Sequence, residues 1–307
     1  MGEEFWWFYD VIVVAAILVC GFIASKQGIF KGVITITGNI VAVVLAFSLS
    51  GFIANFYYNN STESEIIKKM SAPAANSRFG MKMSDYIDNL GYNGLSVNSA
   101  KIEAIYKSDA SKKSYDEQIY SYVNSVNGKE VDRKEAFLEK LHKGYAEVVK
   151  DIVSAKLSKY AAEYAAREIE KDPDSMNELI PLLMKTADGG TENNGAAQYI
   201  AENYIESPYK NHTKLVAFII LMIVFIAAAL FIASSAKVRL YDDMKAATLT
   251  VGALIGIANG AIITLLASAI VRLNVVTGSD AMLFFNNKAI DKTFVFKYFY
   301  QFITDKF

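Results

Sequence analysis

The sequence predicts an all-α membrane protein with four transmembrane helices in two hairpins, and with a helical extracytoplasmic domain between the hairpins. Four strongly apolar stretches contain no Asp, Glu, Lys or Arg: 11–24, 33–54, 215–236 and 246–271. Three of them reach the ~20 residues that an α-helix needs to cross a bilayer core of about 30 Å. The composition agrees, because 53% of the residues are hydrophobic and yet 21% are charged.

The first apolar stretch is short for a membrane span, but its flanks favour one. Trp6 and Trp7 belong to an aromatic run that extends it, and rings with a polar edge are favoured at the membrane interface. A signal peptide carries positive charge before its apolar run, whereas Asp10 and two glutamates stand there in this chain. We therefore expect a spanning helix, with Trp6, Trp7 and Asp10 at the interface.

The orientation follows from Lys and Arg in the short loops, since these residues tend to stay on the cytoplasmic side. Both short loops are basic: Lys26 and Lys31 lie in the first, and Lys237, Arg239 and Lys245 in the second. This places both short loops in the cytoplasm. The N-terminus, the central domain and the C-terminus are then extracytoplasmic.

The chain divides into four predicted parts. These are a hairpin over 1–58, a helical domain over 59–213, a second hairpin over 214–272, and an aromatic-rich interfacial tail over 273–307. In the central domain, capping-box spacing predicts helix starts at Thr62, Asp132 and Ser175. An apolar stripe from Phe137 to Tyr164 predicts one long helix over 132–171.

The sequence offers little chemistry of its own. The central domain holds 20 Lys and Arg against 24 Asp and Glu, which gives no basic field for nucleic acid. Cys20 is the single cysteine, and neither His142 nor His212 stands near other ligands at metal-site spacing. With no nucleophile elbow or phosphate loop either, we expect no enzyme, no catalytic residue, no metal site and no cofactor.

Small and polar residues in the apolar stretches are the predicted site residues. Small residues on one face let helices approach closely where lipid removes the usual hydrophobic driving force. They recur every four positions at Gly252, Gly256 and Gly260, and again at Gly28 and Gly32, with Gly38 following. Asn39 and Asn259 are the deepest polar residues. Counted from the ends of their apolar stretches, they lie at depths of about 9 and 20 Å, too unequal for an easy direct pair. Each is expected to bond a neighbouring helix or to line a pathway.

Three segments of the predicted hairpins and tail resemble the colicin V production protein family: Asp10 with 28–46, the glycine-rich 252–260, and the C-terminal 290–298. The hairpins and tail to which they belong make up about half of the chain. The resemblance implies a bacterial inner-membrane protein associated with production or secretion of a peptide toxin (bacteriocin), or with envelope homeostasis. It supplies no catalytic residue. The chain departs from the family at Thr248-Leu249 and at Asn259, and its central domain is an insertion to which no family property transfers.

The function expected is that of an accessory or scaffold protein in the membrane. Its partners would be the lipid bilayer and a membrane or envelope protein, and the sequence also leaves a homo-oligomer open. Two other classes remain. One is a small channel or transporter, against which the scarcity of intramembrane charge argues. The other is a membrane-anchored surface sensor or interaction module.

Overall fold

The computed structural model describes residues 5–27, 29–92, 94–108, 113–185, 190–235, 246–276 and 287–307, and for 246–248 the backbone alone. These residues form helices and no strand, which confirms the all-α prediction. Four helices are long and apolar enough to cross a membrane, as the four apolar stretches predicted. The chain forms two compact units: Met1–Tyr57 with Lys210–Phe307, here called the membrane unit, and Tyr58–Tyr209, here called the helical domain.

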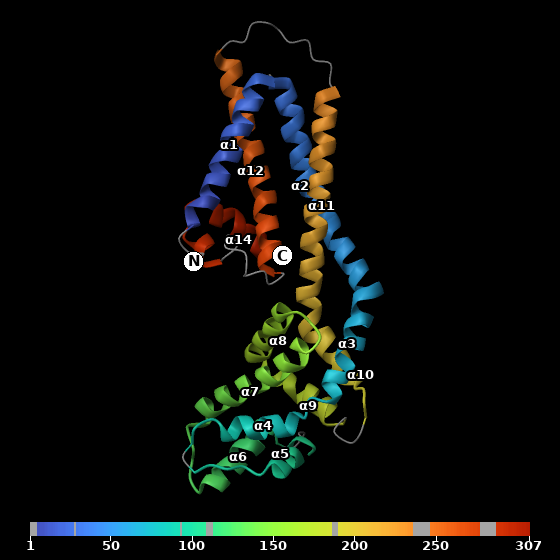
Figure 1. Cartoon of the computed structure of the whole chain (residues 1–307), viewed down its shortest axis with the longest axis vertical. Coiled ribbons are helices and arrows are strands. Elements are labelled where there is room, and N and C mark those ends of the chain that lie inside the picture. The colour runs from blue at the N-terminus through green and yellow to red at the C-terminus, as the bar shows by residue number, and fades with distance from the viewer. Residues whose placement is uncertain are drawn as a thin grey trace. The chain divides into compact units, whose positions relative to one another are not determined.

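The membrane unit is built on the four long helices. They are α1 (Trp6–Gln27), α2 (Ile29–Tyr57), α11 (Glu206–Ser235, whose first turn belongs to the helical domain) and α12 (Ala246–Val276). Helix α1 lies along α12, and α2 lies beside α11 (Figure 1). Two short helices follow, α13 (Asn287–Asp291) and α14 (Phe296–Lys306). Phe296, Tyr300 and Ile303 form the buried face of α14.

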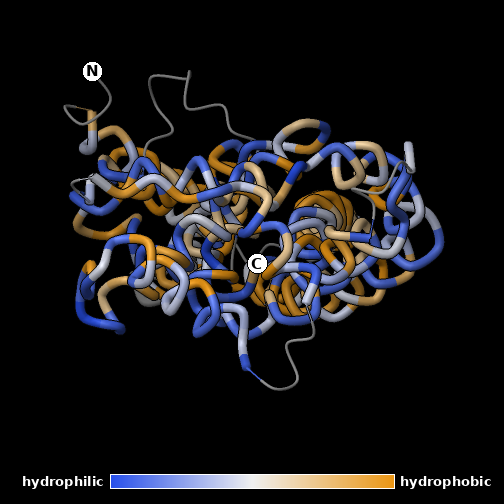
Figure 2. The backbone as a smooth tube through the Cα atoms, turned by 90° about the horizontal axis from the view of Figure 1, so that it is seen from below, coloured by the Kyte–Doolittle hydropathy of each residue, from blue (hydrophilic) through white to orange (hydrophobic). Residues whose placement is uncertain are grey.

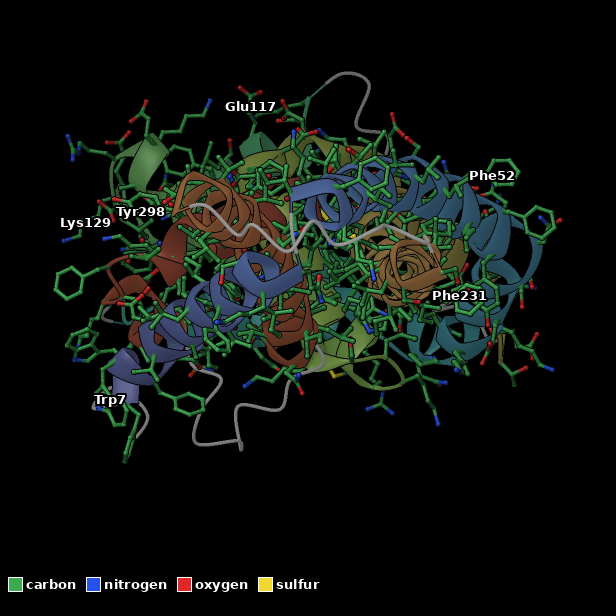
Figure 3. All side chains as sticks on the ribbon, turned by 90° about the horizontal axis from the view of Figure 1, so that it is seen from above. Trp7, Phe52, Glu117, Lys129, Phe231 and Tyr298 are labelled. Atoms are coloured by element: carbon green, nitrogen blue, oxygen red, sulfur yellow. The ribbon has the colours of Figure 1, made fainter. Side chains whose placement is uncertain are left out.

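The outer surface of the four long helices is apolar. Trp7, Phe52 and Phe231 point outward from the ribbon (Figure 3), and Phe231 is 72% exposed. In Figure 2, a helix viewed nearly along its axis has the orange colour of hydrophobic residues over several successive turns. Large exposed apolar faces of this kind are stable against lipid and mark a membrane surface. The unit is thus suited to association with a bilayer.

The helical domain contains short helices around its own core. In chain order they are α3 (Glu63–Ala75), α4 (Phe79–Asp88), α5 (Ser99–Tyr106), α6 (Tyr115–Asn127), α7 (Lys134–Ser154), α8 (Lys159–Lys171), α9 (Met176–Met184) and α10 (Asn194–Ile200). Single π-helical turns, η2 (Tyr58–Thr62) and η4 (Ala201–Ile205), and a 3₁₀ turn, η3 (Pro173–Ser175), complete it. Met70, Ile102 and Val149 are among its fully buried side chains.

The predicted long helix over 132–171 is wrong. The chain instead forms α7 and α8, which pack against each other. The break is set by Ser158, whose side chain accepts a hydrogen bond from the Ala161 N–H and so caps α8. In α7 the predicted stripe faces the core, whereas the buried face of α8 consists of Ala161, Ala162, Ala165 and Ile169 and includes neither Tyr160 nor Tyr164.

Helices begin next to all three predicted starts, α3 at Glu63, α7 at Lys134 and α9 at Met176, but none of the three predicted side chains caps its helix. Thr62 and Ser175 already have helical backbone angles, so each continues a preceding turn and caps nothing. The Asp132 carboxylate instead accepts hydrogen bonds from Lys140 and from the Arg133 N–H. The side chains that do cap helices in this domain are Asn98, Ser114, Ser158 and Asn193.

Candidate functional site

The predicted glycines of α12 form a seam along which α12 packs against α1. A Cβ atom added to Gly260 would lie 2.6 Å from the Ile17 Cα, and one added to Gly252 would lie 3.0 Å from the Ala24 carbonyl oxygen. At Gly256 it would overlap the backbone at Cys20 and Gly21. The two helices therefore touch backbone to backbone, which only glycine permits.

Helix α2 presents an equally narrow face. Its buried residues are all small or polar and recur every three or four positions: Gly32, Thr35, Asn39, Ala42, Ala46, Ser50 and Ala54. Gly38 points elsewhere, toward α11, where an added Cβ would lie 2.7 Å from the Ala229 Cβ. At Gly32 it would meet the Ile255 Cγ2 of α12 at 3.2 Å. Gly28 lies outside the described residues.

Asn39 and Asn259 meet inside the membrane unit. The Asn39 Nδ2 donates a hydrogen bond to the Asn259 Oδ1 over 2.9 Å, and both side chains are buried. The expectation that their depths are too unequal for an easy direct pair is therefore wrong. The depth of Asn39 was counted from Val33, whereas α2 begins at Ile29. From the observed helix starts, the two residues lie about 15 and 20 Å along their helices, a difference of one turn.

A cavity of about 200 Å³ adjoins this pair, and all four long helices line it. Its polar lining consists of Gln27, Thr35, Asn39 and Asn259. Ile226, Leu230 and Ile263 are among its apolar residues, and Cys20 also borders it. None of the lining residues is Asp, Glu, Lys, Arg or His. A neutral molecule therefore suits this cavity better than an ion.

One polar atom beside the cavity lacks a partner. The Asn39 Oδ1 is buried and accepts no hydrogen bond from any described residue. A buried acceptor without a partner costs about 1–3 kcal/mol. The atom lies beside the cavity, which marks the Asn39–Asn259 pair as a place where a further polar group could bind.

Asp10 ties the first and last segments of the membrane unit together. Its carboxylate accepts three backbone hydrogen bonds, from Phe294 at 2.8 Å and from Val295 and Phe296 at 3.0 Å. These N–H groups begin α14, where a carboxylate is favoured by unpaired donors and by the helix dipole. Sequence analysis placed Asp10 at the interface but did not find this contact, because 284 residues separate Asp10 from Phe294.

The two predicted interfacial tryptophans face different surroundings. The Trp6 ring packs edge-on against Phe294, with ring centroids 5.4 Å apart. Trp7 points away from the bundle and is 48% exposed (Figure 3). Trp6 therefore helps to hold the C-terminal segment, and Trp7 is available to lipid.

A partly buried polar cluster lies in the helical domain, and sequence analysis did not find it. The His142 Nε2 lies 2.6 Å from the Asp116 Oδ2, and the Tyr145 hydroxyl donates to the Asp116 Oδ1 over 3.0 Å. The Tyr106 hydroxyl donates to the Tyr145 hydroxyl over 3.4 Å. Burial raises the pKa of both tyrosines above the ordinary value. This network joins α5, α6 and α7, so a structural role accounts for it.

Comparisons of the chain with models of protein families, with curated proteins and with solved structures find no match. Across the described residues, no three His, Cys, Asp or Glu side chains come together as metal ligands. The Asn39–Asn259 pair, its cavity and the separate core of the helical domain therefore carry the functional argument.

Proposed function

We propose that this chain is an accessory or scaffold protein of a bacterial cell membrane. Its membrane unit fixes it in the bilayer, and its helical domain binds a membrane or envelope protein on the extracytoplasmic side. The observation that carries this proposal is that the helical domain has its own core and forms a compact unit. A domain of about 150 residues exceeds what anchoring or loop closure requires and offers a large binding surface.

The composition of the helical domain supports a protein partner. Its balanced charges, with ion pairs such as Lys82–Asp151 and Lys134–Glu117 on its surface, argue against nucleic acid. The resemblance to the colicin V production protein family supports a role in bacteriocin production and secretion, or in envelope homeostasis. The basic short loops support an extracytoplasmic position of the domain.

A shortened chain tests the proposal. Residues 58–209 are replaced by a flexible linker, and the shortened and full chains are expressed in cells that lack the protein. We expect the shortened chain to insert into the membrane but not to restore bacteriocin secretion or envelope integrity. Equal rescue by both chains would contradict the scaffold function, because the membrane unit would then be sufficient.

A second candidate, a small channel or transporter, is favoured by one observation, the cavity beside Asn39 and Asn259. Its uncharged lining argues against ion or proton coupling. Reconstituted liposomes decide between the two functions. Solute flux that is lost in Asn259→Leu and kept in Asn274→Leu, a change on the same helix away from the cavity, would favour transport.

A further inference from the structure

We propose that the cavity in the membrane unit binds a small, uncharged and mostly apolar molecule through one hydroxyl or amide group. This ligand site goes beyond the scaffold function and does not depend on it. The cavity of about 200 Å³ lies among the four long helices, next to the seam where α12 and α1 touch backbone to backbone. It is therefore a local departure from the close packing of α12 against α1.

The asparagine pair leaves one buried hydrogen-bonding atom that a further polar group would satisfy. The Asn39 amide gives its Nδ2 donor to Asn259, and its buried Oδ1 has no partner among the described residues. If the side-chain amides of Asn39 and Asn259 are both rotated by 180°, the atom without a partner becomes the Asn39 Nδ2, which is a donor at the same position. A hydroxyl or an amide can donate and accept, so either group satisfies the pair in both arrangements.

The rest of the lining sets the character of the ligand. Ile226, Leu230 and Ile263 provide an aliphatic wall. No lining residue carries a charge, so an ionic ligand would lose its hydration without compensation. An apolar cavity of about 150 Å³ holds a molecule as large as benzene. The observed volume therefore fits a chain or ring of roughly six to ten carbon atoms that ends in one hydroxyl or amide.

The source of such a group is either a free small alcohol or amide, or the hydroxyl-bearing head of a membrane lipid. Both present the same chemistry to Asn39. Competition separates them, because a short alcohol fits within the cavity, whereas a monoacylglycerol must also extend its chain into the bilayer.

Photolabelling of the full chain in lipid nanodiscs tests the site. The probe is an octanol that carries a diazirine near the end of its chain, and mass spectrometry locates the adducts. We expect adducts at Ile226 and Ile263, displaced by excess 1-octanol and not by octane. Competition by 1-octanol alone indicates a free ligand, and competition by monooleoylglycerol as well indicates a lipid. Adducts confined to outward-facing residues such as Phe231, or equal competition by octane, would overturn the proposal.

Two variants sharpen the test. Asn39→Leu keeps the side-chain size and removes the amide, so labelling of the cavity should fall at least fivefold, while Asn274→Leu should label normally. Asn39→Leu also breaks the asparagine pair and can impair folding. Ile226→Phe leaves the pair intact and adds bulk to a buried wall residue, so it should also reduce labelling. A folded Ile226→Phe variant that labels as strongly as the unaltered chain would overturn the site.

Discussion

Replacement of Gly256 by alanine should separate α1 from α12. The added Cβ would lie 2.5 Å from the Gly21 Cα, and it would also overlap the Cys20 backbone. Ordinary carbon contacts are about 3.5–4.0 Å, so the helices must move apart by about 1 Å. A gap of 0.5–1 Å already forfeits about a quarter to a half of the contact energy, and the seam continues at Gly252 and Gly260. We expect a cost of about 1–3 kcal/mol, the usual range for overpacking.

Gly51→Ala is the matched control. Its added Cβ would meet only the Lys214 Cε, at 4.0 Å. Both replacements gain the same helix propensity of about 1 kcal/mol, so the difference between the two variants isolates the overpacking. The assay is unfolding in mixed micelles by titration with dodecyl sulfate, followed by tryptophan fluorescence. Equal midpoints for the two variants would refute the close contact between α1 and α12.

Three further predictions follow from the other contacts. Asp10→Ala should increase amide exchange over 294–296 at least tenfold, because each charge-assisted bond contributes about 1.5–3 kcal/mol, and Asp305→Ala should leave it unchanged. Burial raises the pKa of Tyr106, so its contribution to stability is complete below about pH 10 and falls as the pH rises above that value. Between pH 8 and 11, the melting temperature of Tyr106→Phe should then fall less than that of the unaltered chain. An equal fall for both would contradict this. Asn39→Leu should destabilise the membrane unit by about 0.5–2 kcal/mol, and Asn39→Leu with Asn259→Leu should recover most of that. A double variant that is less stable than the single one would show that the pair itself stabilises the bundle.

The four long helices could be predicted from the sequence because length and apolarity decide which segments can span a bilayer. The cavity could not, since it depends on how four helices pack. The Asn39–Asn259 contact was missed because it depends on where α2 begins, and four residues shift the depth of Asn39 by about 6 Å. The glycine seam was foreseen as a packing face, but its partner helix, α1, has no matching glycine repeat to identify it.

The helical domain shows a different limit of the sequence. An apolar stripe at helical spacing does not reveal a hairpin when both of its arms face one core, and the break before α8 depends on a single serine, Ser158. Capping patterns were equally ambiguous. Ser114 and Glu117 have the spacing of a capping box, and Ser114 does cap α6, whereas Ser175 with the same spacing caps nothing. What separates the two cases is whether the preceding turn already satisfies the N–H groups, and tertiary structure decides that.

Cysteine labelling on intact cells tests most directly whether the chain crosses the membrane as two hairpins with the helical domain outside. In a Cys20→Ser background, single cysteines replace Ser121, which is exposed in the helical domain, and Ser25, near the end of α1. A membrane-impermeant maleimide should label the cysteine at position 121 on intact cells and the one at position 25 only after lysis. Labelling at position 25 on intact cells with none at position 121 would contradict the proposed topology, and with it the extracytoplasmic binding surface.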